Sequence, residues 1–165
     1  MQIRLDDLSG GEVIALLHEH LADMYATSPP ESVHALDVDA LKASNIRFFS
    51  AWQDGLLAGC VAIKALDSQQ AELKSMRTAK AFRSKGVGQA LLEFIIEHAK
   101  AQGFTVLSLE TGTQDYFAPA RNLYRKYGFT ACGPFGQYKL DPNSHFMTLR
   151  LITAERCDTL KPVTP

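Results

Sequence analysis

The chain has 165 residues, of which 46% are hydrophobic and 21% charged, and its formal net charge is −1. This length and composition are typical of one globular domain and exclude a largely disordered chain. The nearly neutral charge argues against nucleic acid as a partner, because a surface that follows a phosphate backbone must be basic.

The cysteines and the N-terminus indicate a cellular compartment. Cys60, Cys132 and Cys157 are widely spaced and odd in number, which is typical of neither a disulfide framework nor a metal site. The N-terminus carries two aspartates where a signal peptide would need an apolar run. The longest apolar stretch, Leu56–Ile63, is too short to span a bilayer. We therefore expect a cytoplasmic protein without a metal or a membrane partner.

The first half of the chain is predicted to form two helices and an antiparallel hairpin. The hairpin is indicated by Asp54-Gly55 between two apolar segments, since this dipeptide favours a two-residue turn. The predicted elements are a strand at Gln2–Asp6, a helix at Gly11–Tyr25, a short helix at Val38–Ala43, and strands at Ile46–Trp52 and Leu56–Leu66.

The second half alternates strands with helices. Its predicted elements are a strand at Gln70–Thr78, a helix from Gly86 to Gly103, a strand at Phe104–Glu110, a helix at Tyr116–Tyr127, and strands at Phe129–Cys132 and His145–Leu151. The two strands that flank the first of these helices should be parallel, because a crossover helix joins them. The element order is βααβββαβαββ in one domain, residues 1–151, followed by a C-terminal tail, residues 152–165.

A glycine-rich loop before the longest predicted helix is the first functional signal. The loop and helix start read Arg83-Ser84-Lys85-Gly86-Val87-Gly88-Gln89-Ala90. The first amides of a helix lack internal partners and carry partial positive charge, and glycine lets a phosphate approach the backbone. A P-loop needs a trailing Gly-Lys-Ser/Thr, and a dinucleotide fingerprint needs a small residue where Leu91 stands. The spacing therefore indicates a different diphosphate site.

A second motif lies about 35 residues downstream. The segment Ala120–Phe129 reads Ala-Arg-Asn-Leu-Tyr-Arg-Lys-Tyr-Gly-Phe, which predicts a helix that ends at Gly128. Ala120, Leu123 and Tyr124 share one helix face. Considered without the upstream loop, Tyr124 would be interpreted as a core aromatic residue.

Together the two motifs, Arg-x-x-Gly-x-Gly-x-Ala and Ala-x-x-Leu-Tyr-x-x-x-Gly-Phe, resemble the GCN5-related N-acetyltransferase (GNAT) family, and the chain looks like a member of a bacterial subgroup of uncharacterised small-molecule acetyltransferases. The resemblance covers roughly residues 1–151. It implies an α/β fold, the acyl-CoA N-acyltransferase fold. In that fold a mixed sheet of six or seven strands is flanked by about four helices, and the central parallel strands splay apart. It also implies acetyl-CoA as the cosubstrate.

The same resemblance implies which residues bind acetyl-CoA. The diphosphate would lie on the loop and helix start, and the pantetheine arm against the strand before them. The residues matched in this way are Met76, Arg77, Thr78, Arg83, Ser84, Lys85, Gly86, Val87, Gly88, Gln89 and Asn122.

Two residues are candidates for proton transfer. The resemblance places the Tyr124 hydroxyl near the thioester sulfur, where it would protonate the leaving thiolate, and leaves Tyr127 to packing or the surface. Glu72 occupies the strand position that some relatives use for a general base. Simple strand alternation puts Glu72, Lys74 and Met76 on one face. Glu72 is equally well interpreted as a partner of Lys74 or a solvated side chain, with a water chain removing the proton.

The acceptor is expected to be a primary amine of a small molecule. The loop that contains Ser32 and His34, and the strand residue Lys74, supply the candidate substrate-binding groups. His34 and Arg77 would suit a carboxylate on an amino-acid-like acceptor. Two alternatives stay open: a protein or peptide N-acetyltransferase, which an open groove around residues 28–36 would favour, and a non-catalytic acyl-CoA sensor. The sequence does not decide the oligomeric state, and a homodimer is one option.

Overall fold

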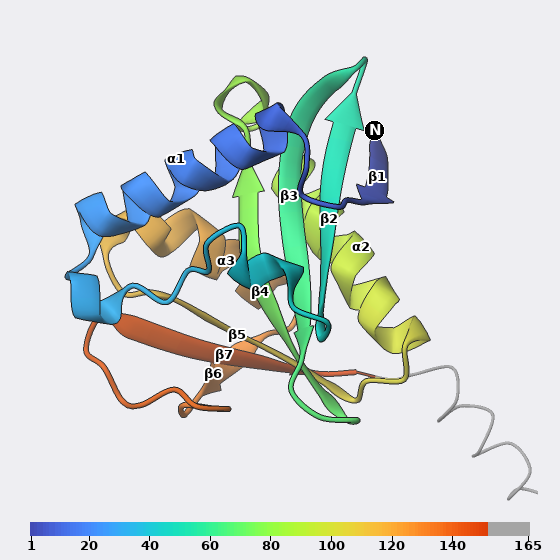
Figure 1. Ribbon diagram of the computed structural model, residues 1–165. Coiled ribbons are helices and arrows are strands. Elements are labelled where there is room, and N and C mark those ends of the chain that lie inside the picture. Colours follow the sequence, from blue (N-terminus) through green and yellow to red (C-terminus); the bar gives the residue numbers. More distant parts are fainter. Residues whose placement is uncertain (152–165) are drawn as a thin grey trace, which may run out of the picture.

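The computed structural model describes residues 1–151, and the predicted tail, residues 152–165, lies outside them. Within that range a mixed sheet is covered by helices on both faces (Figure 1). The strands are β1 (Gln2–Leu5), β2 (Ile46–Gln53), β3 (Leu56–Ala65), β4 (Gln70–Thr78), β5 (Val106–Gly112), β6 (Thr130–Cys132) and β7 (Ser144–Arg150). The α-helices are α1 (Gly11–Thr27), α2 (Val87–Ala101) and α3 (Ala118–Lys126). Short 3-10 turns lie at Pro30–Ser32, Ala40–Lys42, Lys80–Phe82 and Asp115–Phe117.

The seven-stranded sheet has the order β1-β2-β3-β4-β5-β7-β6. Strand β4 pairs with β5 in parallel, and the other neighbours are antiparallel. The predicted hairpin joins β2 to β3, with left-handed backbone at Asp54 (φ 52°) and Gly55 (φ 78°), as a two-residue turn of this kind requires. The predicted α/β fold with its parallel central pair is therefore confirmed.

Each face of the sheet carries its own apolar core. Helices α2 and α3 cover one face, where Phe49 packs with Leu91 and Tyr124. Helix α1 covers the other face, where Phe48 packs with Leu17. In Figure 1, α1 lies in front of the sheet and α2 behind it. The alternation of Phe48 and Phe49 shows how one strand supplies both cores, since successive side chains point to opposite faces.

The predicted second helix, Val38–Ala43, is wrong. The segment forms only a three-residue 3-10 turn, Ala40–Lys42, whose first amide donates to Asp37 Oδ1 at 2.8 Å. Only Leu41 of this turn is buried. A segment this short fixes too many dihedral angles for the few hydrogen bonds it gains, so an α-helix does not form. Residues 1–151 therefore contain three α-helices instead of the four expected.

Two predicted boundaries shift for local reasons. Strand β5 begins at Val106 instead of Phe104, because the Phe104 amide still donates to the Ala99 carbonyl at the end of α2. Helix α3 begins at Ala118 with Pro119 in its first turn, a position that proline favours because its missing amide proton is not needed there.

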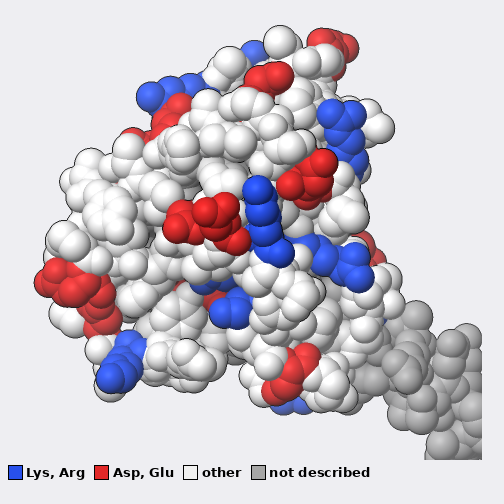
Figure 2. All heavy atoms as spheres, in the orientation of Figure 1, with Lys and Arg blue, Asp and Glu red and all other residues white. Residues whose placement is uncertain are grey.

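The surface carries no large field of one charge sign on the face drawn in Figure 2, where acidic and basic side chains are interspersed. Among the helices of residues 1–151, none combines the length and the apolar character that crossing a membrane requires.

Candidate active site

The central parallel strands separate soon after they pair. Hydrogen-bonded register joins Gln70–Glu72 of β4 to Val106–Ser108 of β5. Beyond that point β5 continues in register with β7 and diverges from β4 in Figure 1. The side chains that follow on the two strands, such as Lys74 and Glu110, therefore face a cavity instead of a neighbouring strand. Two adjoining cavities occupy this region, and they share wall residues from α1, β4 and β5.

A β-bulge in β4 sets which side chains reach each cavity. Cys60 pairs with Arg77 and Ala62 with Lys74, so Ser75 and Met76 together oppose the single residue between Cys60 and Ala62. Ser75 has a left-handed backbone with φ 54°. The bulge breaks simple alternation, so the prediction that Met76 shares a face with Lys74 is wrong: Met76 packs against the core under α2, whereas Arg77 returns to the α1 face.

The larger cavity has a volume of about 440 Å³ and is the candidate acyl-CoA channel. Five of the residues predicted to bind acetyl-CoA line it: Met76, Arg77, Thr78, Arg83 and Gly88. Tyr124 lies in the same wall, on α3. The channel therefore joins the glycine-rich loop to the motif tyrosine.

The glycine-rich loop leaves its amides available at the mouth of this channel. Ser84 (φ 61°) and Gly86 (φ 83°) are left-handed and exposed, and α2 begins at Val87. The first backbone hydrogen bond of α2 runs from the Ala90 amide to the Gly86 carbonyl, so the amides before Ala90 lack helical partners. The dipole of this 15-residue helix adds partial positive charge at the same place.

The other six residues predicted to bind acetyl-CoA do not line the channel: Ser84 and Gly86 of the loop, and Lys85, Val87, Gln89 and Asn122. Val87 is buried in the core, and Lys85 is exposed at the loop, with its ammonium 5.9 Å from the Phe82 ring centroid. The Gln89 amide donates to Glu93, and exposed Asn122 accepts a hydrogen bond from Arg125. These side chains surround the loop without reaching the cavity.

Tyr124 is the tyrosine of α3 that faces the channel, and Tyr116, in the 3-10 turn before α3, lines the channel too. The Tyr124 side chain is buried and its ring packs at a tilt against Phe129. Burial, together with the negative charge of Glu110, raises the pKa of the Tyr124 phenol, so its proton stays on oxygen at neutral pH. Tyr127 instead donates a hydrogen bond to Glu93 on α2 and lies away from the channel.

Arg77 connects the sheet to α1. Its guanidinium donates to Glu19 Oε1 and to Asp23 Oδ2, each at 2.6 Å, and the side chain is buried. Hydrogen bonds from Arg77 lower the pKa of both carboxyl groups, which are ionised at neutral pH. The sequence suggested that Arg77 binds a carboxylate of the acceptor. Because two carboxylates of α1 already bind its guanidinium, Arg77 is not available for that role.

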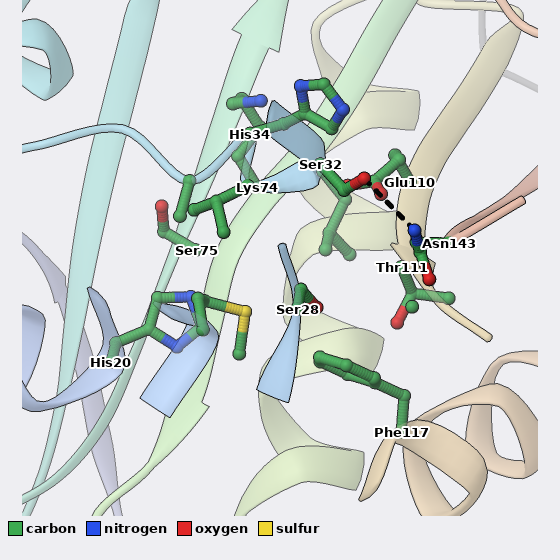
Figure 3. A pocket seen from close by; sticks show the side chains of 15 residues that line it. His20, Ser28, Ser32, His34, Lys74, Ser75, Glu110, Thr111, Phe117 and Asn143 are labelled. Atoms are coloured by element: carbon green, nitrogen blue, oxygen red, sulfur yellow. Dashed lines mark hydrogen bonds between the residues drawn. The ribbon is translucent and has the colours of Figure 1, made fainter. Parts of the chain in front are cut away.

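The smaller chamber adjoins the channel on the side of the predicted acceptor loop. Its volume is about 80 Å³, and its walls come from α1, the loop after α1, β4, β5 and the segment before β7. Ser32, His34 and Lys74, the three predicted substrate-binding residues, all line it (Figure 3). The structure thus brings together three residues that are up to 42 positions apart in the sequence.

Glu110 is a site residue that the sequence analysis missed. It lies on β5, half-buried in the chamber wall, and burial raises its pKa to about 7 against the lowering influence of the Lys74 ammonium. A carboxyl group that titrates near neutral pH in a cavity is a candidate acid or base. Its signal in the sequence is a charged residue that directly follows the largely apolar run Val106–Leu109 in the same predicted strand.

Glu72, the predicted base, lies next to this chamber without lining it. Its Oε2 accepts hydrogen bonds from the Tyr138 hydroxyl at 2.5 Å and from the Lys74 ammonium at 3.1 Å, and only 3% of the residue is exposed. The side chain forms part of a separate cavity with Tyr138. This is the arrangement of a Lys74 partner, which was the alternative interpretation of Glu72.

Two loops close the chamber over the acceptor side. The Ser32 hydroxyl donates to Asp141 Oδ2 at 2.7 Å, and the Asn143 amide donates to the Ser32 oxygen at 3.3 Å, the dashed line in Figure 3. The His34 ring packs edge-on against Tyr138, with centroids 5.1 Å apart. These contacts hold residues 28–36 against the segment before β7.

Comparison with known proteins agrees with this geometry. Residues 13–129 match the model of the acetyltransferase (GNAT) family. The chain is 50% identical over 151 residues to the uncharacterized N-acetyltransferase YsnE of Bacillus subtilis (strain 168), covering 92% of the chain and 100% of that protein. It is 46% identical over 149 residues to the uncharacterized N-acetyltransferase YedL of Escherichia coli (strain K12), covering 90% and 94%.

The fold is shared with solved structures. One is a GNAT family acetyltransferase from Elizabethkingia anophelis with acetyl-CoA bound, which has a TM-score of 0.66 and 19% identity, with 91% of this chain and 97% of that chain covered. The family match spans both the glycine-rich loop and the motif helix, and the relatives match over their full or nearly full length. This chain therefore belongs to the GNAT acetyltransferase family and is an acetyl-CoA-dependent N-acetyltransferase.

Proposed function

We propose that the protein transfers the acetyl group of acetyl-CoA to the primary amine of a compact small molecule, by direct attack within a ternary complex. The observation that carries the proposal is the pair of adjoining cavities. A channel of about 440 Å³ runs from the glycine-rich loop to Tyr124, and a chamber of about 80 Å³ holds Glu110. The chamber admits only a few non-hydrogen atoms, which suits the reacting end of a small acceptor.

The channel residues fit acetyl-CoA. Arg83 and the free amides at the start of α2 would bind the diphosphate, and β4 around Met76 would lie along the pantetheine arm. When bound, acetyl-CoA supplies an activated thioester carbonyl. A backbone amide near Met76 would polarise that carbonyl, because the bulge frees this part of β4 from regular pairing with β3.

Glu110, instead of Glu72, is the base in this proposal. An alkylamine has a pKa of about 10.4, so only about one molecule in a thousand is neutral at pH 7. The Glu110 carboxylate would accept a proton from the amine, directly or through a water molecule, as the nitrogen attacks. Its pKa of about 7 leaves it largely ionised slightly above neutral pH, whereas Glu72 is already bonded to Tyr138 and Lys74.

Tyr124 is the acid. As the carbon–nitrogen bond forms and the carbon–sulfur bond breaks, the phenol would donate its proton to the leaving sulfur. Its raised pKa means that the phenol is protonated at neutral pH when the sulfur departs, and Glu110 on the opposite side of the junction can hold the proton taken from the amine. Two groups with separated proton affinities therefore face the reacting atoms from the two cavities.

A peptide or protein acceptor is less compatible with this chamber. Such an acceptor needs an open groove, whereas the Ser32–Asp141 and Asn143–Ser32 hydrogen bonds hold two loops together across the acceptor side. A non-catalytic sensor would have no use for a carboxyl group that titrates near pH 7 beside the Tyr124 channel.

The test is acetyl-CoA consumption with a panel of small amines, amino acids, polyamines, aminoglycosides and peptides, with mass spectrometry of the products. We expect N-acetylated product from at least one compact amine and none from peptides. Product only from peptides would contradict the small acceptor, and tight CoA binding without any product would favour the sensor.

A further inference from the structure

His20 lies at the junction of the two cavities. It comes from the second half of α1 and lines both the channel and the acceptor chamber. Figure 3 shows its ring on the side of the chamber opposite Glu110 and Asn143. A group in this position meets the acceptor where the amine approaches the acetyl group, and the mechanism proposed above does not use it.

The two ring nitrogens of His20 differ in their surroundings. Nδ1 is buried and has no hydrogen-bond partner within residues 1–151. Nε2 is not among the buried unpartnered atoms, and the ring lines both cavities, so Nε2 is the nitrogen that a bound molecule can reach. A proton on Nδ1 would be a buried donor without an acceptor, which costs free energy, so the ring proton belongs on Nε2.

The His20 ring is uncharged at neutral pH. Burial, with the nearby positive charge of Arg77 adding to it, lowers the pKa of His20 to about 4. The ionic groups around it are engaged with one another: Arg77 binds Glu19 and Asp23 on the same helix. Lys74 also lines both cavities, and its ammonium is bonded to Glu72 and Tyr138. His20 therefore presents a neutral N–H donor at the junction.

We propose that His20 is a positioning residue that selects acceptors with a neutral oxygen, a hydroxyl or an amide carbonyl, close to the reacting amine. The Nε2–H group donates to that oxygen, which turns the amine toward the thioester and Glu110. A carboxylate there would face the ionised Glu110 across the chamber, and a second ammonium would meet an N–H group that cannot accept a hydrogen bond. The inference rests on the proposed function and names its substrate class as amino alcohols and amino amides.

The experiment compares ethanolamine with propylamine, two amines of equal size that differ by a hydroxyl in place of a methyl group. kcat/KM is measured for each amine with wild type and with His20→Leu, His20→Gln and His20→Asn. The ratio between the two amines is compared across variants, because this cancels their different basicities. His18→Leu is the matched control, since exposed His18 lies on the same helix and lines neither cavity.

We expect the ethanolamine preference to fall about tenfold in His20→Leu, the cost of leaving one hydrogen bond unmade. His20→Gln, whose amide nitrogen replaces Nε2, should retain the preference, and His20→Asn, which reaches only the Nδ1 position, should not. KM for acetyl-CoA and the His18→Leu ratio should stay at the wild-type values. If His20 had a merely structural role, kcat/KM would fall equally for both amines in all three variants.

Three results would overturn the inference, and they distinguish its failure from a failure of the proposed function. The first is an ethanolamine preference that survives in folded His20→Leu. The second is a wild type that acetylates propylamine as well as ethanolamine after correction for free amine. Either result removes the role of His20 and leaves the acetyltransferase function standing. No product from either amine overturns the inference, and the small-amine acceptor falls with it only if the whole amine panel also gives no product.

Discussion

The Tyr138 hydroxyl lies 2.5 Å from Glu72 Oε2 and donates a hydrogen bond to it, across 66 positions of the sequence. Burial and the nearby Glu72 carboxylate both raise the pKa of Tyr138, so the phenol keeps its proton and stays a donor. Lys74 completes the cluster, since its ammonium donates to the same Glu72 oxygen at 3.1 Å and to the Tyr138 hydroxyl at 2.9 Å. This bonding makes Glu72 a structural charge partner, which is why the proposed mechanism assigns the proton of the amine to Glu110.

Glu110→Gln should lower kcat/KM for the acceptor about a hundredfold at neutral pH, a typical loss for a missing general base. Wild-type kcat/KM should rise as pH passes through about 7, where Glu110 ionises, and the variant should lack this rise. The loss of kcat/KM in Glu110→Gln relative to wild type should shrink at high pH, where free amine is abundant. The pH–rate profile of Glu72→Gln is the control, and a hundredfold loss there with none in Glu110→Gln would return the base to Glu72.

The same carboxyl group should make stability depend on pH. The pKa of Glu110 is raised from 4.5 to about 7 in the folded protein, so the fold favours the protonated form. That stabilisation is fully present below about pH 4.5 and is lost as pH rises through 7. Urea unfolding should therefore show Glu110→Gln gaining about 1 to 3 kcal/mol relative to wild type between pH 4.5 and pH 8. A difference that does not change with pH would contradict the raised pKa.

Tyr124→Phe should reduce turnover about tenfold or more while acetyl-CoA affinity stays the same, because only the proton donor for the leaving sulfur is removed. Tyr127→Phe is the matched control, since Tyr127 bonds Glu93 outside the channel. Stopped-flow measurement of CoA release and calorimetry of binding separate the two effects. Equal, small losses in both variants would mean that Tyr124 serves only to pack against Phe129.

Gly86→Asp should abolish acetyl-CoA binding in a folded protein. Gly86 has φ 83° and open space around the position of an added Cβ, so the variant costs about 1 kcal/mol of backbone strain and puts a negative charge at the diphosphate site. Gly55→Asp is a control with nearly the same backbone, φ 78° and equally open, in the β2–β3 hairpin, where it lines neither cavity. Calorimetry should find normal affinity in Gly55→Asp only. Arg83→Ala should bind more weakly, with a loss that depends on salt.

Arg77→Met should destabilise the protein by about 1 to 3 kcal/mol, because Glu19 and Asp23 lose their cation and α1 loses its connection to β4. Arg77 lowers the pKa of both carboxyl groups, so its contribution is present above their ordinary values near 4 and is lost as pH falls below them. Urea unfolding at pH 7 and pH 3 should show the difference shrinking at pH 3. Lys100→Met, which breaks an exposed pair with Glu97, should change stability by less than about 0.5 kcal/mol at either pH.

The sequence by itself was sufficient for the order of the seven strands and the three α-helices, the glycine-rich loop and the motif helix, because each is encoded within a short segment. Glycine at a left-handed position, a turn dipeptide such as Asp54-Gly55 and apolar spacing along a helix all act over a few residues. The same signals fail where a segment is too short to hold its own structure, as at Val38–Ala43, which forms only a 3-10 turn.

The tertiary structure alone decided which ionisable groups are free to react. The bulge at Ser75 moves Arg77 to the face of α1, where Glu19 and Asp23 neutralise it. Tyr138 and Lys74 engage Glu72, whereas Glu110 keeps a carboxyl group whose pKa burial raises. These outcomes depend on contacts between segments far apart in the chain and on exclusion of water by the packed fold, and neither is encoded in any local pattern of residues.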